Sequence, residues 1–143
     1  MQDLEIAKKR LNTERLTLSI VKDRNIIFES AAHGISGLLD AIEENGDSLE
    51  ASSVADRIAG KAAALLCIYA KVKAVYAATL SQKAKEVLEE QHVYHEWDNI
   101  VENIFNADKT AVCPFEKLAT ETLSPSDAYG KLKALQARLE SCR

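Results

Sequence analysis

The spacing of hydrophobic positions changes along the N-terminal part of the chain. Over residues 2–13 the apolar side chains recur at helical spacing, which predicts a first helix. Over residues 16–20 apolar and polar positions alternate, which is the period of a half-buried strand. A polar turn near residues 23–25 and an apolar segment at residues 26–28 complete a predicted β-hairpin.

The longest apolar stretch lies in the middle of the chain. Residues 54–69 are apolar almost all round, apart from Asp56, Arg57 and Lys61, and this pattern predicts a single buried helix. Ser53 is the expected N-cap of that helix, with Asp56 in the place of a capping-box acid.

The remaining segments alternate between helices and strands. Cap signatures separate several of them, such as Ser81 before one helix and Ser124-Pro125 before the last. The further predicted elements are a brief helix at 38–42, a central strand at 72–80, a helix at 82–91, a strand at 93–97, a helical turn or two at 100–105, a short helix opening at 113 and a final helix from 125 onward.

This order of elements predicts an α/β protein, arranged as a three-layer α/β/α sandwich with a mixed sheet. The 143 residues fit a single domain over residues 1–143, and no low-complexity linker divides them. An apolar fraction of 47% with a charged fraction of 28% is typical of a globular chain and not of a disordered one.

Charge and cysteine content narrow the classes of function. The chain has 18 Lys and Arg against 22 Asp and Glu, whereas a nucleic-acid binder needs surplus cations to replace phosphate counterions. We therefore expect no nucleic-acid partner. The sequence has no signal-peptide pattern and no apolar run long enough to cross a bilayer, so no membrane partner is expected either. Three cysteines, an odd number, favour a reduced, cytoplasmic location.

Three motifs carry a family resemblance. They are Asp56-Arg57-Ile58-Ala59-Gly60-Lys61-Ala62-Ala63-Ala64, then Val75-Tyr76-Ala77 with Leu80-Ser81, then Cys113-Pro114-Phe115-Glu116-Lys117-Leu118. With these motifs in this order, the chain resembles the bacterial and archaeal domain-of-unknown-function family 1893 over residues 4–135. The resemblance implies a cytidine-deaminase-like fold. It implies no particular activity, because none is established for the family.

Zinc deaminases hold their metal with a His or Cys near a Glu on one helix and a Pro-Cys-x-x-Cys on the next. At these two places the chain has Gly60-Lys61-Ala62 and Ser81-Gln82-Lys83-Ala84, which supply no ligand. Cys113-Pro114 stands in inverted order, and His92 and His95 would face opposite sides of a strand. The sequence therefore argues against zinc-dependent deamination, and we expect no metal and no cofactor.

Gly60 and Lys61 fall inside the predicted central helix, and they have two interpretations. Glycine inside a helix costs about 1 kcal/mol relative to alanine, so a packing or functional reason is needed. In the structural interpretation, Gly60 lets a neighbouring element pack closely while Lys61 extends to water. In the functional one, Lys61 projects into the pocket where deaminases keep their metal and binds an anion or acts as a reactive amine.

Cys113 and two serines are the other candidates. Cys113 lies at a predicted helix start, where the backbone dipole favours a thiolate, and Glu116 would be its acidic neighbour. The alternative is a small buried thiol before a proline. Ser81 and Ser36 precede helices, where α/β folds bind phosphate on exposed amides, although an N-cap and a turn are the simpler interpretations.

Three hypotheses of function follow. The leading one is a non-zinc deaminase-like domain that binds a nucleotide or nucleoside derivative in the ancestral pocket, as fold-level analogy suggests. The alternatives are a thiol- or lysine-dependent enzyme and a non-catalytic interaction or scaffold protein, and a homo-oligomer is compatible with all three. The ligand-binding candidates are Lys61, Gly60, Ser81, Ser36, Asp56 and Glu116, and the catalytic candidates are Lys61 and Cys113.

Overall fold

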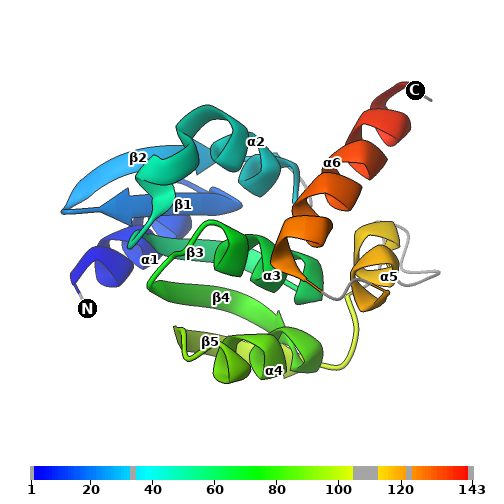
Figure 1. The fold of residues 1–143 in the computed structure, drawn as a ribbon. Coiled ribbons are helices and arrows are strands. Elements are labelled where there is room, and N and C mark those ends of the chain that lie inside the picture. Colours follow the sequence, from blue (N-terminus) through cyan, green and yellow to red (C-terminus); the bar gives the residue numbers. More distant parts are fainter. Residues whose placement is uncertain (1, 33–34, 105–112, 122–123, 142–143) are drawn as a thin grey trace.

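The fold is built on a five-stranded mixed sheet with the strand order β2-β1-β3-β4-β5. The computed structural model describes residues 2–32, 35–104, 113–121 and 124–141 (Figure 1). The strands are β1 (Leu18–Lys22), β2 (Asn25–Ser30), β3 (Ser53–Ala59), β4 (Ala74–Ser81) and β5 (Tyr94–Val101). The helices are α1 (Gln2–Thr13), α2 (Ser36–Asn45), the 3₁₀ turn η1 (Gly46–Leu49), α3 (Lys61–Tyr69), α4 (Gln82–Glu90), α5 (Pro114–Thr120) and α6 (Pro125–Ser141).

The sheet has helices on both faces, so the protein is the three-layer α/β/α sandwich with a mixed sheet that the sequence predicts. On one face, Leu4, Ala7 and Leu11 of α1 pack with Val21 and Tyr76 of the sheet. The larger core lies on the other face, where side chains of α2, α3, α4, α5 and α6 are buried together against the strands. Figure 1 shows α1 behind the sheet, α3 and α4 in front of it, and α5 beyond the carboxyl ends of the strands.

The middle of the chain corrects the sequence prediction of one helix over residues 54–69. Residues 53–59 instead form β3, which pairs antiparallel with β1 and parallel with β4 at the centre of the sheet. Ser53 is therefore the first residue of a strand and not an N-cap, and Asp56 lies within that strand. A central strand is buried on both faces and so shows no alternation, which makes its pattern resemble that of a buried helix.

The end of β5 is a second correction. The sequence pattern predicts a strand over residues 93–97 and then a helical turn, whereas β5 continues to Val101, paired with β4 along its length. Phe105, the last residue of that predicted turn, lies outside the described residues. The predictions of α1, the β1–β2 hairpin, α2, β4, α4, α5 and α6 are confirmed to within a few residues at their ends.

The parallel part of the sheet brings several strand ends together. β3, β4 and β5 run parallel, so their carboxyl ends lie at the same edge of the sheet. The first two of these strands lead directly into α3 and α4. No helix in the described part of the chain is long and apolar enough to cross a membrane.

Candidate functional site

Two helices begin side by side at the carboxyl edge of the parallel strands. β3 ends at Ala59, Gly60 is the N-cap residue, and α3 starts at Lys61. β4 ends at Ser81, whose hydroxyl accepts a hydrogen bond of 3.1 Å from the backbone N–H of Ala84 in the first turn of α4. In open α/β sheets, ligands bind outside the carboxyl ends of the strands, where helix amides point outward. This edge is therefore the first place to examine.

Glu116 of α5 occupies the start of α3. Its carboxylate accepts hydrogen bonds from the backbone N–H of Lys61 at 2.8 Å and of Ala62 at 2.9 Å. These are two of the N–H groups that a helix leaves without partners at its first turn, and the helix dipole favours an anion there. The Glu116 residue is only 7% exposed, so a buried carboxylate from a distant segment caps α3.

Gly60 is required by space and not by backbone conformation. Its φ of −102° and ψ of −170° are extended values that any residue adopts. A Cβ atom built at Gly60 would lie 2.2 Å from the carboxyl carbon of Glu116 and 2.3 Å from one of its oxygens. The structural interpretation of Gly60, that it lets a neighbour pack closely, is confirmed, and the neighbour is the Glu116 carboxylate.

Gly60 does not carry the cost of a glycine inside a helix that the sequence analysis assigned to it. Gly60 lies before the first helical residue and not inside a helix, and glycine is acceptable at an N-cap. Lys61 is likewise the first residue of α3 and is half-buried, with its backbone N–H committed to Glu116.

Two lysines set the electrostatic environment of the buried carboxylate. Burial raises the pKa of Glu116 above its ordinary value, while the amides of Ala62 and Lys61 and the charges of Lys83 and Lys61 act in the opposite direction. Lys83, the second residue of α4, is exposed and is not among the residues that the sequence singled out as a site. Its place two residues after Ser81 is the signal that could have identified it.

Cys113 lies directly before α5, and its backbone carbonyl accepts a hydrogen bond from Lys117 at 3.0 Å. The thiol is free and the residue half-buried. The helix that Cys113 precedes also carries Glu116 to α3, but no described contact joins Cys113 to Lys61. Cys67, in contrast, is buried in α3, where burial raises the pKa of its thiol.

Asp56 and Ser36 are not brought against Glu116. Asp56 is half-buried in the middle of β3, and burial raises the pKa of its carboxyl group to about 7, although the amides of Ile58 and Arg57 and the Arg57 charge oppose this shift. Ser36 begins α2, whose next residue, Gly37, packs against the β-hairpin; a Cβ there would lie 2.9 Å from Ser30. The structure thus unites Gly60, Lys61 and Glu116, with Ser81 on the adjacent helix start.

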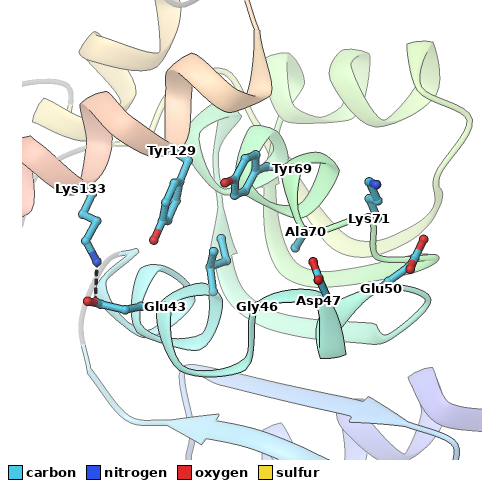
Figure 2. A pocket seen from close by; sticks show the side chains of 10 residues that line it. Glu43, Gly46, Asp47, Glu50, Tyr69, Ala70, Lys71, Tyr129 and Lys133 are labelled. Atoms are coloured by element: carbon cyan, nitrogen blue, oxygen red, sulfur yellow. Dashed lines mark ion pairs between the residues drawn. The ribbon is translucent and has the colours of Figure 1, made fainter.

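Two surface hollows lie elsewhere. One of about 580 Å³ lies between α2, the C-terminal end of α3 and α6, where Tyr69 and Tyr129 stack with ring centroids 4.7 Å apart and Lys133 forms an ion pair with Glu43 (Figure 2). The other, of about 320 Å³, lies beside β5 and is lined by residues that include Lys8 and Tyr76. Neither is lined by a residue that the sequence predicted to bind a ligand or to be catalytic.

Comparison with known proteins adds a family and a fold. The family model described as TM1506, a domain of unknown function (DUF1893), matches residues 6–135. The fold resembles the crystal structure of a DUF1893 family protein (TM1506) from Thermotoga maritima, with a TM-score of 0.84 and 28% identity over 93% of this chain and 89% of that one.

A more distant likeness concerns the fold alone. Acinetobacter baumannii RibD, form 1, which has a deaminase-like fold, matches with a TM-score of 0.50 and 19% identity. The match covers 84% of this chain but only 35% of RibD. No curated protein is significantly similar to the chain in sequence.

Proposed function

Because the chain belongs to the DUF1893 family and has a deaminase-like fold without zinc ligands at the two helix starts, we propose that it binds a nucleotide or nucleoside derivative where α3 and α4 begin. One observation carries the proposal. The backbone amides of Lys61 and Ala62 already hold a carboxylate, that of Glu116, at 2.8 and 2.9 Å. Backbone that binds one oxyanion at a helix start has the geometry to bind another, such as a phosphate.

The charges around this edge suit the anionic part of a nucleotide. Lys61 and Lys83 stand on adjacent helix starts and both lower the pKa of Glu116, so both ammonium groups act on the same place. The N-terminus of α4, capped by Ser81, adds a second set of amides directed toward the same edge. Phosphate is the common biological anion that uses several amides and two ammonium groups together.

The dimensions of the strand favour a ligand larger than a free phosphate. Asp56 lies on β3 and precedes Gly60, the extended residue just after that strand, by four residues. Since a strand rises about 3.3 Å per residue, the two are about 13 Å apart. Ile58, between them, is 53% exposed. A ligand with a phosphate at Lys61 and a sugar or base hydrogen-bonded to Asp56 has to be about as long as a nucleotide.

Thermal unfolding in the presence of nucleotides tests the proposal. A ligand at one hundred times its dissociation constant adds about 2.7 kcal/mol to the free energy of unfolding, so the melting temperature should rise with a nucleoside monophosphate, diphosphate or nucleotide sugar. Lys61→Ala keeps the backbone amide that Glu116 uses and should lose most of that rise. Lys131→Ala, on the exposed side of α6, is the matched control and should keep it. No rise with any nucleotide, or a full rise in Lys61→Ala, contradicts the proposal.

A further inference from the structure

β5 forms one edge of the sheet. In the described part of the chain it has β4 on one side and no strand on the other (Figure 1). Its register against β4 is constant from Tyr94 to Val101, and it contains no lysine or proline, which natural edge strands often use to prevent further pairing. At the opposite edge, the pairing of β2 with β1 shifts register beside Ile20. β5 is therefore the edge to which another strand is added with less distortion.

The two faces of β5 carry different side chains. The Glu96 carboxylate accepts a hydrogen bond of 2.9 Å from the ammonium group of Lys8 in α1, so Glu96 faces α1. Because side chains alternate along a strand, Asp98 lies on the same face as Glu96 and Trp97 lies on the other. Lys85 of α4 is 5.5 Å from the centroid of the Trp97 ring, which agrees with this placement. The strand thus presents carboxylates on one face and an indole on the other.

The face toward α1 has more carboxylates than cations. Asp98 is exposed, and its described partner is a neutral group, the hydroxyl of Tyr76, which donates to it at 2.5 Å. Both Glu96 and Asp98 line the hollow of about 320 Å³ beside β5, and Lys8 is the one cation among the residues that line it. Lys8 also forms an ion pair of 3.6 Å with Glu5. The hollow therefore combines an excess of negative charge with space for a side chain.

From the free edge, the carboxylates and the hollow, we propose that β5 binds an extended basic segment of a partner protein, which adds a strand to the sheet. In such additions main-chain hydrogen bonds supply affinity, and sites for alternate side chains supply specificity. Glu96 and Asp98 are two residues apart, about 7 Å along the strand, which is the spacing of alternate Lys or Arg side chains on the added strand. The apolar residues between those cations pack against Trp97.

Two further observations favour a basic partner. Tyr94 and Ile100, on the same face as the carboxylates, are 46% and 38% exposed, and the aliphatic stems of Lys or Arg cover such side chains while their charges reach the carboxylates. A second copy of this chain, paired through its own β5, would place like charges side by side on that face, which destabilises a sheet. None of these residues belongs to the proposed nucleotide site, so the inference goes beyond nucleotide binding.

Peptides of matched length test the proposal. The probe is an acetylated and amidated peptide of alternating Lys and Val, as long as β5, and the control has Glu in place of Lys. Trp97 is the only tryptophan and lies at the edge, so its fluorescence reports binding. We expect a saturable change with the Lys peptide that weakens as sodium chloride is added, and no change with the Glu peptide.

N-methylation of the probe separates strand addition from attraction between charges. In a strand the N–H groups of successive residues point to opposite sides, so only the Lys set or only the Val set faces β5. We expect one of two peptides, methylated at every Lys nitrogen or at every Val nitrogen of the backbone, to lose binding while the other keeps it. Unchanged binding of both overturns the proposal, because charge alone would then hold the peptide.

Variants of Asp98 test the charge. Asp98→Asn keeps an acceptor for the Tyr76 hydroxyl and should weaken binding of the Lys peptide several-fold. Asp98→Lys should lose most of that binding and should gain binding of the Glu peptide. Asp40→Lys, on the exposed side of α2, is the matched control and should behave as the wild type. If Asp98→Lys does not fold, as judged by its urea unfolding curve, the Asn variant decides.

Three results overturn the proposal. Full binding of the Lys peptide by Asp98→Asn would show that the Asp98 charge takes no part. No binding of the Lys peptide by the wild type would mean that the carboxylates only protect the edge from aggregation. A wild-type dimer in sedimentation that Ile100→Asp converts to a monomer would assign β5 to a second copy. Melting temperatures with nucleotides test the nucleotide site separately, so either proposal can fail without the other.

Discussion

At the scale of single residues, Gly60 and Glu116 depend on each other. The glycine leaves the space that the carboxylate fills, and the carboxylate binds the amides that follow the glycine. Hydrogen bonds to a charged group are worth about 1.5–3 kcal/mol each, so this pair is a substantial part of the stability of a protein of this size.

Gly60→Ala should therefore destabilise the protein by about 2–4 kcal/mol, because the new methyl group has to expel the Glu116 carboxylate from the α3 amides. Urea unfolding followed by the fluorescence of Trp97, the only tryptophan, measures the effect. Gly130→Ala is the matched control, since a Cβ there meets nothing within 4 Å and alanine favours a helix by about 1 kcal/mol. In a Glu116→Ala background the cost of Gly60→Ala should largely disappear. Additive costs would show that the two residues act independently.

The sequence indicated these residues but not their relation. Gly60, Lys61 and Glu116 were each singled out by type and spacing, and Glu116 was assigned to a ligand. The two hydrogen bonds join Glu116 to Lys61 and Ala62, which precede it in the sequence by 55 and 54 positions. These residues lie on two helices whose relative placement depends on the whole fold. Periodicity describes which face of one element is buried and carries no information on such a pairing.

At the scale of elements, α1 is tied to the β1–β2 turn by Asp3. The turn has two residues, Asp23 and Arg24, with φ values of 51° and 68°, which fit the left-handed two-residue turn usual in tight hairpins. The Asp3 carboxylate accepts hydrogen bonds from both of their backbone N–H groups, at 3.0 and 2.9 Å. Neither turn residue is glycine, so these bonds offset a backbone conformation that other residues adopt at a cost.

Asp3→Ala should cost about 1–3 kcal/mol in the free energy of unfolding, because it removes both acceptors from a buried position. Glu5→Ala, on the same turn of α1 but exposed, should change it by less than about 0.5 kcal/mol. Chemical denaturation of the two variants in parallel measures the difference. Equal effects would show that α1 stabilises the hairpin through its apolar face alone.

Two of the elements that the sequence predicted well have apolar residues that recur at a single period. They are the helical stripe of α1 and the alternating residues that lead into β1, although β1 itself is buried on both faces of the sheet. β3 was assigned to a helix because the segment that contains it is apolar without alternation apart from Asp56 and Arg57, and the break at Gly60 was placed inside that helix. β5 was predicted too short for the opposite reason. It is an exposed edge strand, with Trp97 and Ile100 partly in water, so its apolar and polar residues do not follow the period of a strand.

At the scale of the whole molecule, carboxyl groups of two kinds determine how stability depends on pH. Ion pairs with cationic side chains lower the pKa of Glu29, beside Arg10, and of Glu89, beside Lys85. Burial raises the pKa of Glu116, and of Asp56 to about 7. A group whose pKa is lowered by folding stabilises the protein above its ordinary pKa, and this stabilisation is lost as pH falls. A group whose pKa is raised binds its proton more tightly in the folded state, so the protein loses stability as pH rises.

The two kinds act in different windows, which allows a prediction for neutral pH. The pKa values of Glu29 and Glu89 lie below the ordinary glutamate value, so both groups are ionised in the folded state between pH 5 and 8. Between pH 5 and 8 only the raised groups matter among these four, so the free energy of unfolding of the wild type should fall as pH rises through this range. A shift of Asp56 from 3.8 to about 7 corresponds to about 4 kcal/mol in total, of which the part above pH 5 is visible here.

Asp56→Asn should remove most of this fall, because an amide of the same shape has no proton to lose at this half-buried position in β3. The variant should be more stable than the wild type at pH 8, and its advantage should shrink toward pH 5, where the wild-type carboxyl group is protonated in the folded state. Urea unfolding at four pH values measures both slopes, with Asp40→Asn on the exposed side of α2 as a control that keeps the wild-type slope. Parallel slopes for Asp56→Asn and the wild type would mean that water reaches the Asp56 carboxylate. The Asp56 carboxylate would then be hydrated within the proposed site. Keeping it ionised there, ready to bind a sugar or base, would not destabilise the folded protein.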